Sequence, residues 1–231
     1  LATYTLDGEK LWSKNIEKEH GQFAYQWTPS SSPLLHDGTL YMQVLQRNTK
    51  VRGRGRDNGQ SYILGFDPKT GEQLWKVYRS AKAKAESLEA YSTPVPFTHG
   101  GREEILISGG DCMTGHDPKT GRELWRWGTW NPTRIGHWRL VPSPVAGGGV
   151  VLACAPKRAP VYALKAGAEG DVSSRGMLWH SEGSRDGVSS DVCTPLFYQG
   201  SFFVLYGEGR DKMLSCVEPK TGKIKWASDL E

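Results

Sequence analysis

The sequence predicts an all-β protein, specifically a β-propeller made of four-stranded antiparallel blades. A tryptophan recurs at intervals of roughly 50 residues, and a long self-similar period indicates repeated structural units. The recurring residues are Trp12, Trp75, Trp125, Trp179 and Trp226. Three of them end nearly the same phrase, an acidic residue followed by Pro-Lys-Thr-Gly, at residues 67–75, 117–125 and 218–226. A hairpin signal precedes each phrase. Two hairpins per repeat give the four antiparallel strands of one propeller blade.

The repeated phrase predicts a hairpin in which the turn residues have separate roles. Residues 63–66 are apolar and precede the turn, and residues 74–77 follow it. Pro68 sets the first turn torsion, the Asp67 carboxylate accepts from backbone N–H groups ahead of it, and Gly71 tolerates a positive φ. The phrase therefore contributes the two outer strands of each blade.

The other hairpin of each repeat starts at a Ser-Pro or Thr-Pro pair and turns at glycine. These hairpins lie at residues 32–44, 93–107, 143–152 and 194–205. The expected blades are 28–80, 92–128, 142–181 and 194–231, and residues 1–15 end a preceding blade. All belong to one partial propeller domain, 1–231. A polar, glycine-rich insertion at 166–176 interrupts the fourth phrase, and we expect it to form a longer surface loop.

The repeated phrase resembles the tryptophan-docking motif of the PQQ-like β-propellers. That family includes quinoprotein alcohol dehydrogenases and a non-enzymatic outer-membrane assembly lipoprotein. In the family, the Trp packs on the motif of the neighbouring blade. The resemblance covers almost the whole chain and implies docking roles for Asp67, Gly71, Trp75, Asp117, Gly121, Trp125, Trp179, Gly222 and Trp226. Glu218 stands where the motif has Asp.

The resemblance also implies a ring of seven or eight blades. About four blades are present, so we expect a fragment of such a ring, with the rest of the ring as a partner. A closed four-bladed ring is the alternative, because closed propellers hold typically four to eight blades. Trp75 and Trp125 should be largely buried between adjacent blades. The resemblance further implies a periplasmic or otherwise exported protein.

Composition gives little evidence for catalysis or for metal binding. The apolar runs are strand-sized, so no membrane span is expected. The four cysteines form no Cys-x-x-Cys pair, and the six histidines show no metal-ligand spacing. We therefore predict neither a metal site nor a catalytic residue, and we interpret the cysteines as small buried hydrophobes.

Candidate ligand-binding residues gather in the loops that face the channel mouth. In an antiparallel blade, the turns between the second and third strands share one face with the loops that join successive blades. These loops contain the candidates Trp27, Glu89, Trp130, Arg134, His137, Trp138, Arg139 and Asp191. Aromatic rings beside guanidinium and imidazole groups suit a ligand with flat or polar groups. Blade-to-blade packing of the three tryptophans, and a structural role for His137, are the alternatives.

The same rim has a basic character. The loop at 46–57 contains Arg47, Lys50, Arg52, Arg54 and Arg56, and other loops on this face add Lys157, Arg158, Arg210, Arg134 and Arg139. Such a patch attracts anions, lipid headgroups or nucleic acid. A mobile, solvated loop is the simpler interpretation, and a nucleic-acid partner is not expected.

Two functional classes follow. The favoured one is a non-enzymatic binding or scaffold propeller that contacts a protein, a polysaccharide or a small ligand at the channel mouth. The alternative is part of a PQQ-dependent dehydrogenase that oxidises an alcohol or a sugar. The resemblance implies that such an enzyme holds the quinone on the propeller axis with calcium, for which Asn131, Asp191 and Glu89 are possible ligands. No spacing singles these residues out, and the vicinal cysteine pair of many such enzymes is missing. We therefore predict no cofactor.

Overall fold

A computed structural model describes residues 1–208 and 211–230. Arg210 of the expected basic rim lies outside these ranges. Within them, the helical elements are α1 (Ile16–His20) and a single 3-10 turn at Ala85–Leu88. The rest is strand and loop, so the all-β prediction is confirmed.

The strands form four sheets, each built on four antiparallel strands and one of them extended by a fifth, and one hairpin precedes them. The N-terminal hairpin is β1 (Ala2–Tyr4) and β2 (Lys10–Ser13). The first full sheet is β3 (Leu34–His36), β4 (Thr39–Val44), β5 (Tyr62–Phe66) and β6 (Gln73–Tyr78). The second is β7 (Val95–His99), β8 (Arg102–Gly109), β9 (Cys112–His116) and β10 (Glu123–Gly128). The third is β11 (Val145–Gly147), β12 (Val150–Cys154), β13 (Val161–Lys165) and β15 (Met177–His180). The fourth is β16 (Leu196–Tyr198), β17 (Ser201–Glu208), β18 (Asp211–Val217) and β19 (Ile224–Asp229).

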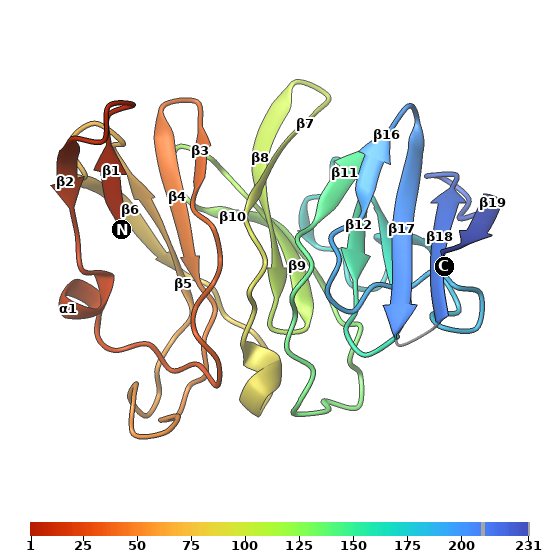
Figure 1. The fold of residues 1–231 in the computed structure, drawn as a ribbon, viewed down its shortest axis with the longest axis horizontal. Helices are drawn as coiled ribbons and strands as arrows, with labels where there is room; N and C mark the ends of the chain where they lie inside the picture. Colours follow the sequence, from red (N-terminus) through yellow and green to blue (C-terminus); the bar gives the residue numbers. More distant parts are fainter. Residues whose placement is uncertain (209–210, 231) are drawn as a thin grey trace.

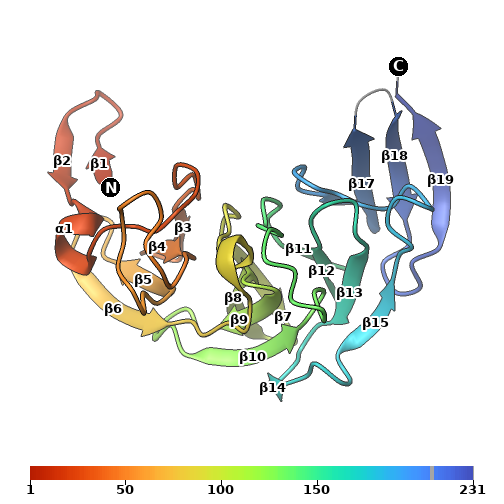
Figure 2. The same cartoon turned by 90° about the horizontal axis from the view of Figure 1, so that it is seen from below.

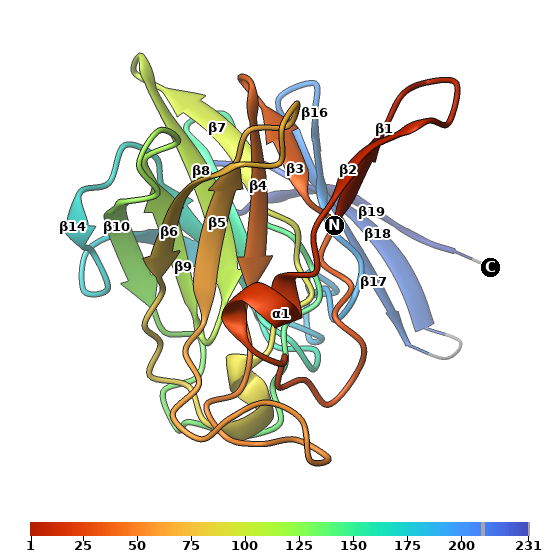
Figure 3. The same ribbon diagram turned by 90° about the vertical axis from the view of Figure 1, so that its left-hand side faces the viewer.

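The sheets follow one another along an arc, as the blades of a propeller do. Seen from below, β6, β10 and β15 lie on the convex side of the arc, and the two chain ends mark its limits (Figure 2). Viewed from its left-hand side, the arc begins with the N-terminal hairpin and α1 (Figure 3). Each sheet pairs consecutive strands in antiparallel register. The arrangement is that of a propeller fragment.

The repeated phrase forms the turn between the third and fourth strand of its blade. In the first copy, Asp67 Oδ1 accepts from the backbone N–H groups of Lys69 and Thr70 at 2.7 and 3.0 Å. In the last copy, a Glu218 carboxylate oxygen accepts from the N–H of Thr221 at 2.7 Å. A glutamate therefore replaces the aspartate without loss of the cap. Gly71 has a φ of 73°, which a side chain would disfavour.

Three tryptophans pack on the turn glycine of the next blade. A Cβ on Gly71 would lie 2.7 Å from the Trp12 ring, and a Cβ on Gly121 would lie 2.6 Å from the Trp75 ring. A Cβ on Gly222 would lie 2.6 Å from the Trp179 ring. The indole N–H groups of Trp12 and Trp179 also donate to the carbonyls of Pro68 and Pro219, at 2.9 and 2.7 Å. Only glycine lets the indole approach so closely.

Trp125 follows a different pattern, because the fourth phrase is interrupted. Its indole N–H donates at 2.5 Å to Glu104 within its own blade, and its side chain is 2% exposed. Trp75 is less buried than expected and keeps partial exposure, whereas Trp226 is 46% exposed. Trp125 is therefore buried as expected, whereas Trp75 is only partly buried.

The insertion at 166–176 is more than the surface loop expected from sequence. Its strand β14 (Gly170–Asp171) pairs in parallel with β10, which makes the second sheet five-stranded. Val172, 5% exposed, donates its backbone N–H to the carbonyl of Arg126 at 2.9 Å. The insertion thus pairs with the outer strand of the preceding blade. It stands in place of the Pro-Lys-Thr-Gly turn that the phrases at 67–75, 117–125 and 218–226 have.

The core lies between neighbouring sheets rather than inside any one of them. One cluster joins Tyr41 and Ile63 of the first sheet to Ile105 and Met113 of the second, and extends to Val151 of the third. Because each sheet is covered by its neighbour, both faces of the inner strands are apolar. This packing fixes the loops at the ends of the sheets.

Candidate functional site

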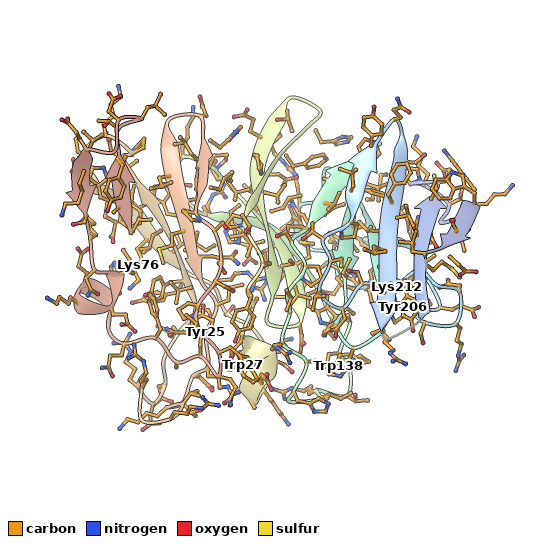
Figure 4. The ribbon with its side chains drawn as sticks, viewed as in Figure 1. Tyr25, Trp27, Lys76, Trp138, Tyr206 and Lys212 are labelled. Atoms are coloured by element: carbon orange, nitrogen blue, oxygen red, sulfur yellow. The ribbon has the colours of Figure 1, made fainter. Side chains whose placement is uncertain are left out.

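The expected sorting of the loops by face is observed. The loops at 45–61, 79–94, 129–144 and 181–195 lie at the lower edge of Figure 1, and the repeated turns lie at the upper edge. Tyr25, Trp27 and Trp138 are all found at this lower edge (Figure 4). The channel-mouth loops of neighbouring blades therefore lie side by side.

An open groove of about 340 Å³ lies where three interblade segments meet, those that contain residues 27–30, 91 and 139–141. We call it the Trp27 groove, and it is lined by Trp27, Thr28, Ser30, Tyr91, Arg139 and Val141. Trp27 is 54% exposed. Its indole N–H donates to a Glu86 carboxylate oxygen at 3.3 Å, and the Arg139 guanidinium donates to the same oxygen at 3.4 Å. The guanidinium carbon lies 5.9 Å from the centroid of the Trp27 ring, within the range of a cation–π contact.

The groove is supported from below by the carboxylate of Glu89, which is fully buried. It accepts from the backbone N–H of Gln26 at 3.0 and 3.1 Å and from the Tyr91 hydroxyl at 2.5 Å. It also pairs with the Arg47 guanidinium. Burial, and then Glu89, raise the pKa of Tyr91, so its hydroxyl stays a donor. Glu89 therefore ties three segments together.

Backbone hydrogen bonds lock the two interblade loops to each other. Ala90 forms a parallel bridge with Leu140, and the Tyr91 N–H donates to the Leu140 carbonyl at 2.8 Å. The Trp138 N–H donates to the Ser87 hydroxyl at 2.8 Å. Trp138 itself is partly buried against the core between the blades. The groove residues thus stand on a hydrogen-bonded frame.

A second cavity, of about 290 Å³, opens between the β8–β9 turn, the loop at 129–134 and the insertion. Asp111 and Asn131 line it, and the Asn131 amide donates to Asp111 Oδ2 at 2.9 Å. Burial raises the pKa of Asp111 to about 7, against the lowering effect of Asn131, Trp130 and Arg134. Arg134 lines the same cavity and donates to the Lys82 carbonyl at 2.6 and 3.0 Å.

The candidate residues from the sequence therefore divide among several places. Trp27 and Arg139 line the groove, Glu89 holds the lining residue Tyr91, and Trp138 packs against the core between the blades. Arg134 lines the second cavity, and Trp130, 2% exposed, belongs to the same core as Trp138. His137 is exposed, and Asp191 accepts from the Lys157 N–H at 2.8 Å in another loop.

Three residues that are not among the ligand-binding candidates from sequence also shape these sites. Glu86 bridges Trp27 and Arg139, and Tyr91 lines the groove. Their place in the same interblade loop as Glu89 was the available signal. For Asp111 there was none, because Gly110-Asp111 has the composition of an ordinary tight turn.

The residues considered for calcium do not form one site. Glu89 is engaged by Gln26, Tyr91 and Arg47, and Asn131 by Asp111 and Ile135. Across residues 1–208 and 211–230, no group of three His, Cys, Asp or Glu side chains is placed to hold a metal ion. Glu89, Asn131 and Asp191 are therefore held by separate partners and are not brought together. Within the same residues, no helix is long and apolar enough to cross a bilayer.

The basic loop is partly neutralised. Arg47 pairs with Glu89, and Arg54 Nη2 lies 2.5 Å from a Glu17 carboxylate oxygen. Lys50 and Arg52 are exposed, and neither has an ion-pair partner among the described residues. The loop itself is held in place, since the Arg47 N–H donates to the Ala24 carbonyl at 3.0 Å. The interpretation of this segment as a mobile, solvated loop therefore does not hold at its first residues, around Arg47.

Comparison with known proteins identifies the fold and not the family. No protein-family model and no curated protein matches the chain. Among solved structures, the chain is similar to a quinohemoprotein alcohol dehydrogenase from Comamonas testosteroni, with a TM-score of 0.62 and 14% identity over 90% of this chain and 35% of that one. A europium-containing methanol dehydrogenase gives a TM-score of 0.56 and 13% identity over 89% and 42% of the two chains.

A third similarity is to BamB from Moraxella catarrhalis, with 15% identity over 85% of this chain and 50% of that one. Its TM-score of 0.49 is too low to support an argument. This chain therefore spans from about a third to half the length of the proteins that it resembles. At these identities the similarity shows a shared β-propeller fold and nothing about chemistry.

Proposed function

We propose that this chain is a non-enzymatic binding module of an exported β-propeller, and that the Trp27 groove is where it contacts a protein partner. The observation that carries the proposal is an exposed tryptophan, with a guanidinium beside it, on a buried and hydrogen-bonded frame. Trp27 keeps 54% of its surface exposed while its indole is held by Glu86 and Arg139.

The composition of the groove suits a protein contact. Trp, Tyr and Arg are the residue types that dominate the binding energy of protein interfaces, and Trp27, Tyr91 and Arg139 line this groove together. Because Glu86 and Glu89 already hold these side chains or their loops, binding requires little further ordering. The same features suit a polysaccharide less well, since the indole N–H is already engaged by Glu86.

The repeat architecture supports the inference that the chain is part of a propeller ring. Trp12, Trp75 and Trp179 lie against the turn glycines of the next blades. We infer that these are the docking contacts of the PQQ-like propellers, and that the chain belongs to a larger ring. The dehydrogenase alternative is not favoured, because Asn131, Asp191 and Glu89 are engaged separately.

Site-specific photo-crosslinking in the native host tests the proposal. A photoreactive residue is placed at Thr28, in the groove, or at Thr120, on the opposite face and exposed. We expect a discrete adduct of one size from Thr28 and none from Thr120. Trp27→Ala and Arg139→Ala should each weaken the Thr28 adduct while the protein level stays unchanged. Equal adduct patterns from the two positions, or a Thr28 adduct that ignores both substitutions, would refute the proposed contact surface.

A further inference from the structure

The Trp27 groove continues into a second hollow. This hollow measures about 410 Å³ and is lined by Glu17, Phe23, Tyr25, Gln26, Pro29, Val51, Arg52 and Arg54, together with Trp27 and Thr28. Trp27 and Thr28 line both hollows, so the two adjoin at the exposed indole, and we call them together the channel-mouth trough. A compact ligand would fill one hollow, whereas an extended segment would occupy both.

Cations stand at both ends of this trough. Arg52 and Arg54 line one end, and Arg139 lines the other. The segment 50–56 carries Lys50, Arg52, Arg54 and Arg56 and no acidic residue. An excess of positive charge at an exposed surface attracts a negatively charged partner.

Two acids at or beside the trough each pair with one of these arginines, Glu17 with Arg54 and Glu86 with Arg139. Glu17 shares its carboxylate between Arg54 and the Phe23 N–H, the latter at 2.9 Å, and the Phe23 bond is the main reason that its pKa is lowered. Glu86 is bonded to Arg139 and to the Trp27 indole. Each acid therefore orients one arginine, and Arg52 remains without a counter-ion among residues 1–208 and 211–230.

The loop that carries these arginines is held in a defined position. Val51 and Arg54 exchange two backbone hydrogen bonds of 2.9 Å. Gly55, at a φ of 84°, packs so closely on Ala24 that a Cβ there would lie 2.5 Å from the Ala24 Cβ. Arg52 and Arg54 therefore belong to a tight turn that packs on Ala24.

Between the charged ends lies an apolar strip. Phe23, Trp27, Pro29 and Val141 line the trough there. We propose that the trough binds an extended acidic segment of the partner protein, with its carboxylates at the Arg52 end and an adjoining apolar side chain on the Trp27 indole. This inference rests on the proposed function and adds the chemistry of the partner.

Charge and hydrophobicity together distinguish this partner from other anions. A free phosphate would use the arginines without the indole, and nucleic acid would depend on salt and on many cations. An acidic segment with an adjoining apolar residue requires both Trp27 and the arginines. The two requirements can be measured separately.

The experiment uses the full-length protein and two fluorescent peptides of about twelve residues. One peptide has glutamates flanking a central Leu-Phe pair, and the other has glutamine in place of every glutamate. We expect saturable binding of the glutamate peptide alone.

Substitutions in the trough test which side chains contribute. Arg52→Ala and Arg54→Ala should each weaken binding of the glutamate peptide about two- to fivefold, the range for exposed ion pairs. Trp27→Ala should weaken it at least about tenfold, as for a central interface residue. Arg122→Ala, an exposed arginine in a repeated turn on the opposite face, is the matched control and should change nothing.

Equal binding of the two peptides would overturn the inference, as would a loss of affinity in Arg122→Ala equal to that in Arg52→Ala. Binding of a uronate polymer to the trough, without binding of the glutamate peptide, would also overturn it. A Thr28-specific protein adduct that forms equally well in Arg52→Ala and Arg54→Ala would leave the proposed function intact and remove only the acidic partner. Absence of the Thr28 adduct would remove both.

Discussion

Replacing Gly121 by alanine tests how one blade is joined to the next. Two costs arise, because Gly121 has a φ of 72° and its Cβ would lie 2.6 Å from the Trp75 ring. The positive φ alone costs about 1–2 kcal/mol for an L-residue. Displacing a packed indole adds about 1–3 kcal/mol, the usual range for overpacking. We therefore expect Gly121→Ala to lower the free energy of unfolding by about 2–5 kcal/mol.

Gly38→Ala is the matched control. Gly38 has a φ of 70°, and an added Cβ would meet no heavy atom within 4 Å, so the substitution has the backbone cost alone. The assay is urea unfolding of the full-length protein carrying either substitution, alone and combined with Trp75→Ala. The excess cost of Gly121→Ala over Gly38→Ala should disappear when Trp75 is removed, because the two groups then no longer interact. Equal costs for the two glycines in the parent background would refute the idea that Trp75 joins the blades at Gly121.

The remaining predictions concern burial and charge. Trp125→Ala should lower the free energy of unfolding by about 3–5 kcal/mol, as for other large core aromatics. Trp27→Ala, at a half-exposed position, should lower it by less than about 1 kcal/mol. Both are measured by the same unfolding assay, and similar losses would contradict the difference in burial between the two side chains. The pKa of Asp111 is raised from 3.8 to about 7, so the folded protein binds this proton more tightly than the unfolded chain, and ionisation destabilises the fold as pH rises from 4 to 7. Asp111→Asn should therefore match the parent below pH 4 and exceed it increasingly up to pH 8, by at most about 4 kcal/mol. A gap in unfolding free energy that does not change with pH would show that Asp111 titrates normally. Asparagine suits the position because it tolerates the φ of 62° found there.

The repeat made most of the fold predictable. The Asp-Pro-Lys-Thr-Gly phrase specifies a turn through local chemistry, and the structure shows Asp67 and Gly71 in the roles that the sequence gives them. The four-stranded sheets follow from the spacing of the hairpins. Local chemistry does not predict where an irregular segment packs. The pairing of β14 with β10 depends on an open strand edge in another blade, which no pattern within 166–176 reveals.

The candidate site was only partly predictable, for a similar reason. Sequence placed Trp27, Glu89 and Arg139 in loops on one face, but it did not distinguish a buried carboxylate from an exposed one. The structure shows that Glu89 is a support and that Trp27 is the exposed element. Trp130 and Arg134 are close to Arg139 in sequence, but Trp130 is buried in the core and Arg134 lines the second cavity, beside Asp111 and Asn131. Such a division depends on long-range packing that the spacing of residues does not encode.

The most direct test of the central claim, that this propeller binds rather than oxidises, is a titration of the full-length protein with PQQ and calcium. Uptake is followed through the absorbance and fluorescence of the quinone, and the same sample is assayed for oxidation of alcohols and sugars with an artificial electron acceptor. The separate engagement of Glu89, Asn131 and Asp191 predicts no stoichiometric uptake and no turnover above a sample without protein. The Thr28 adduct should form in the same preparation. Tight one-to-one uptake of PQQ with calcium-dependent turnover would contradict the account and establish the dehydrogenase.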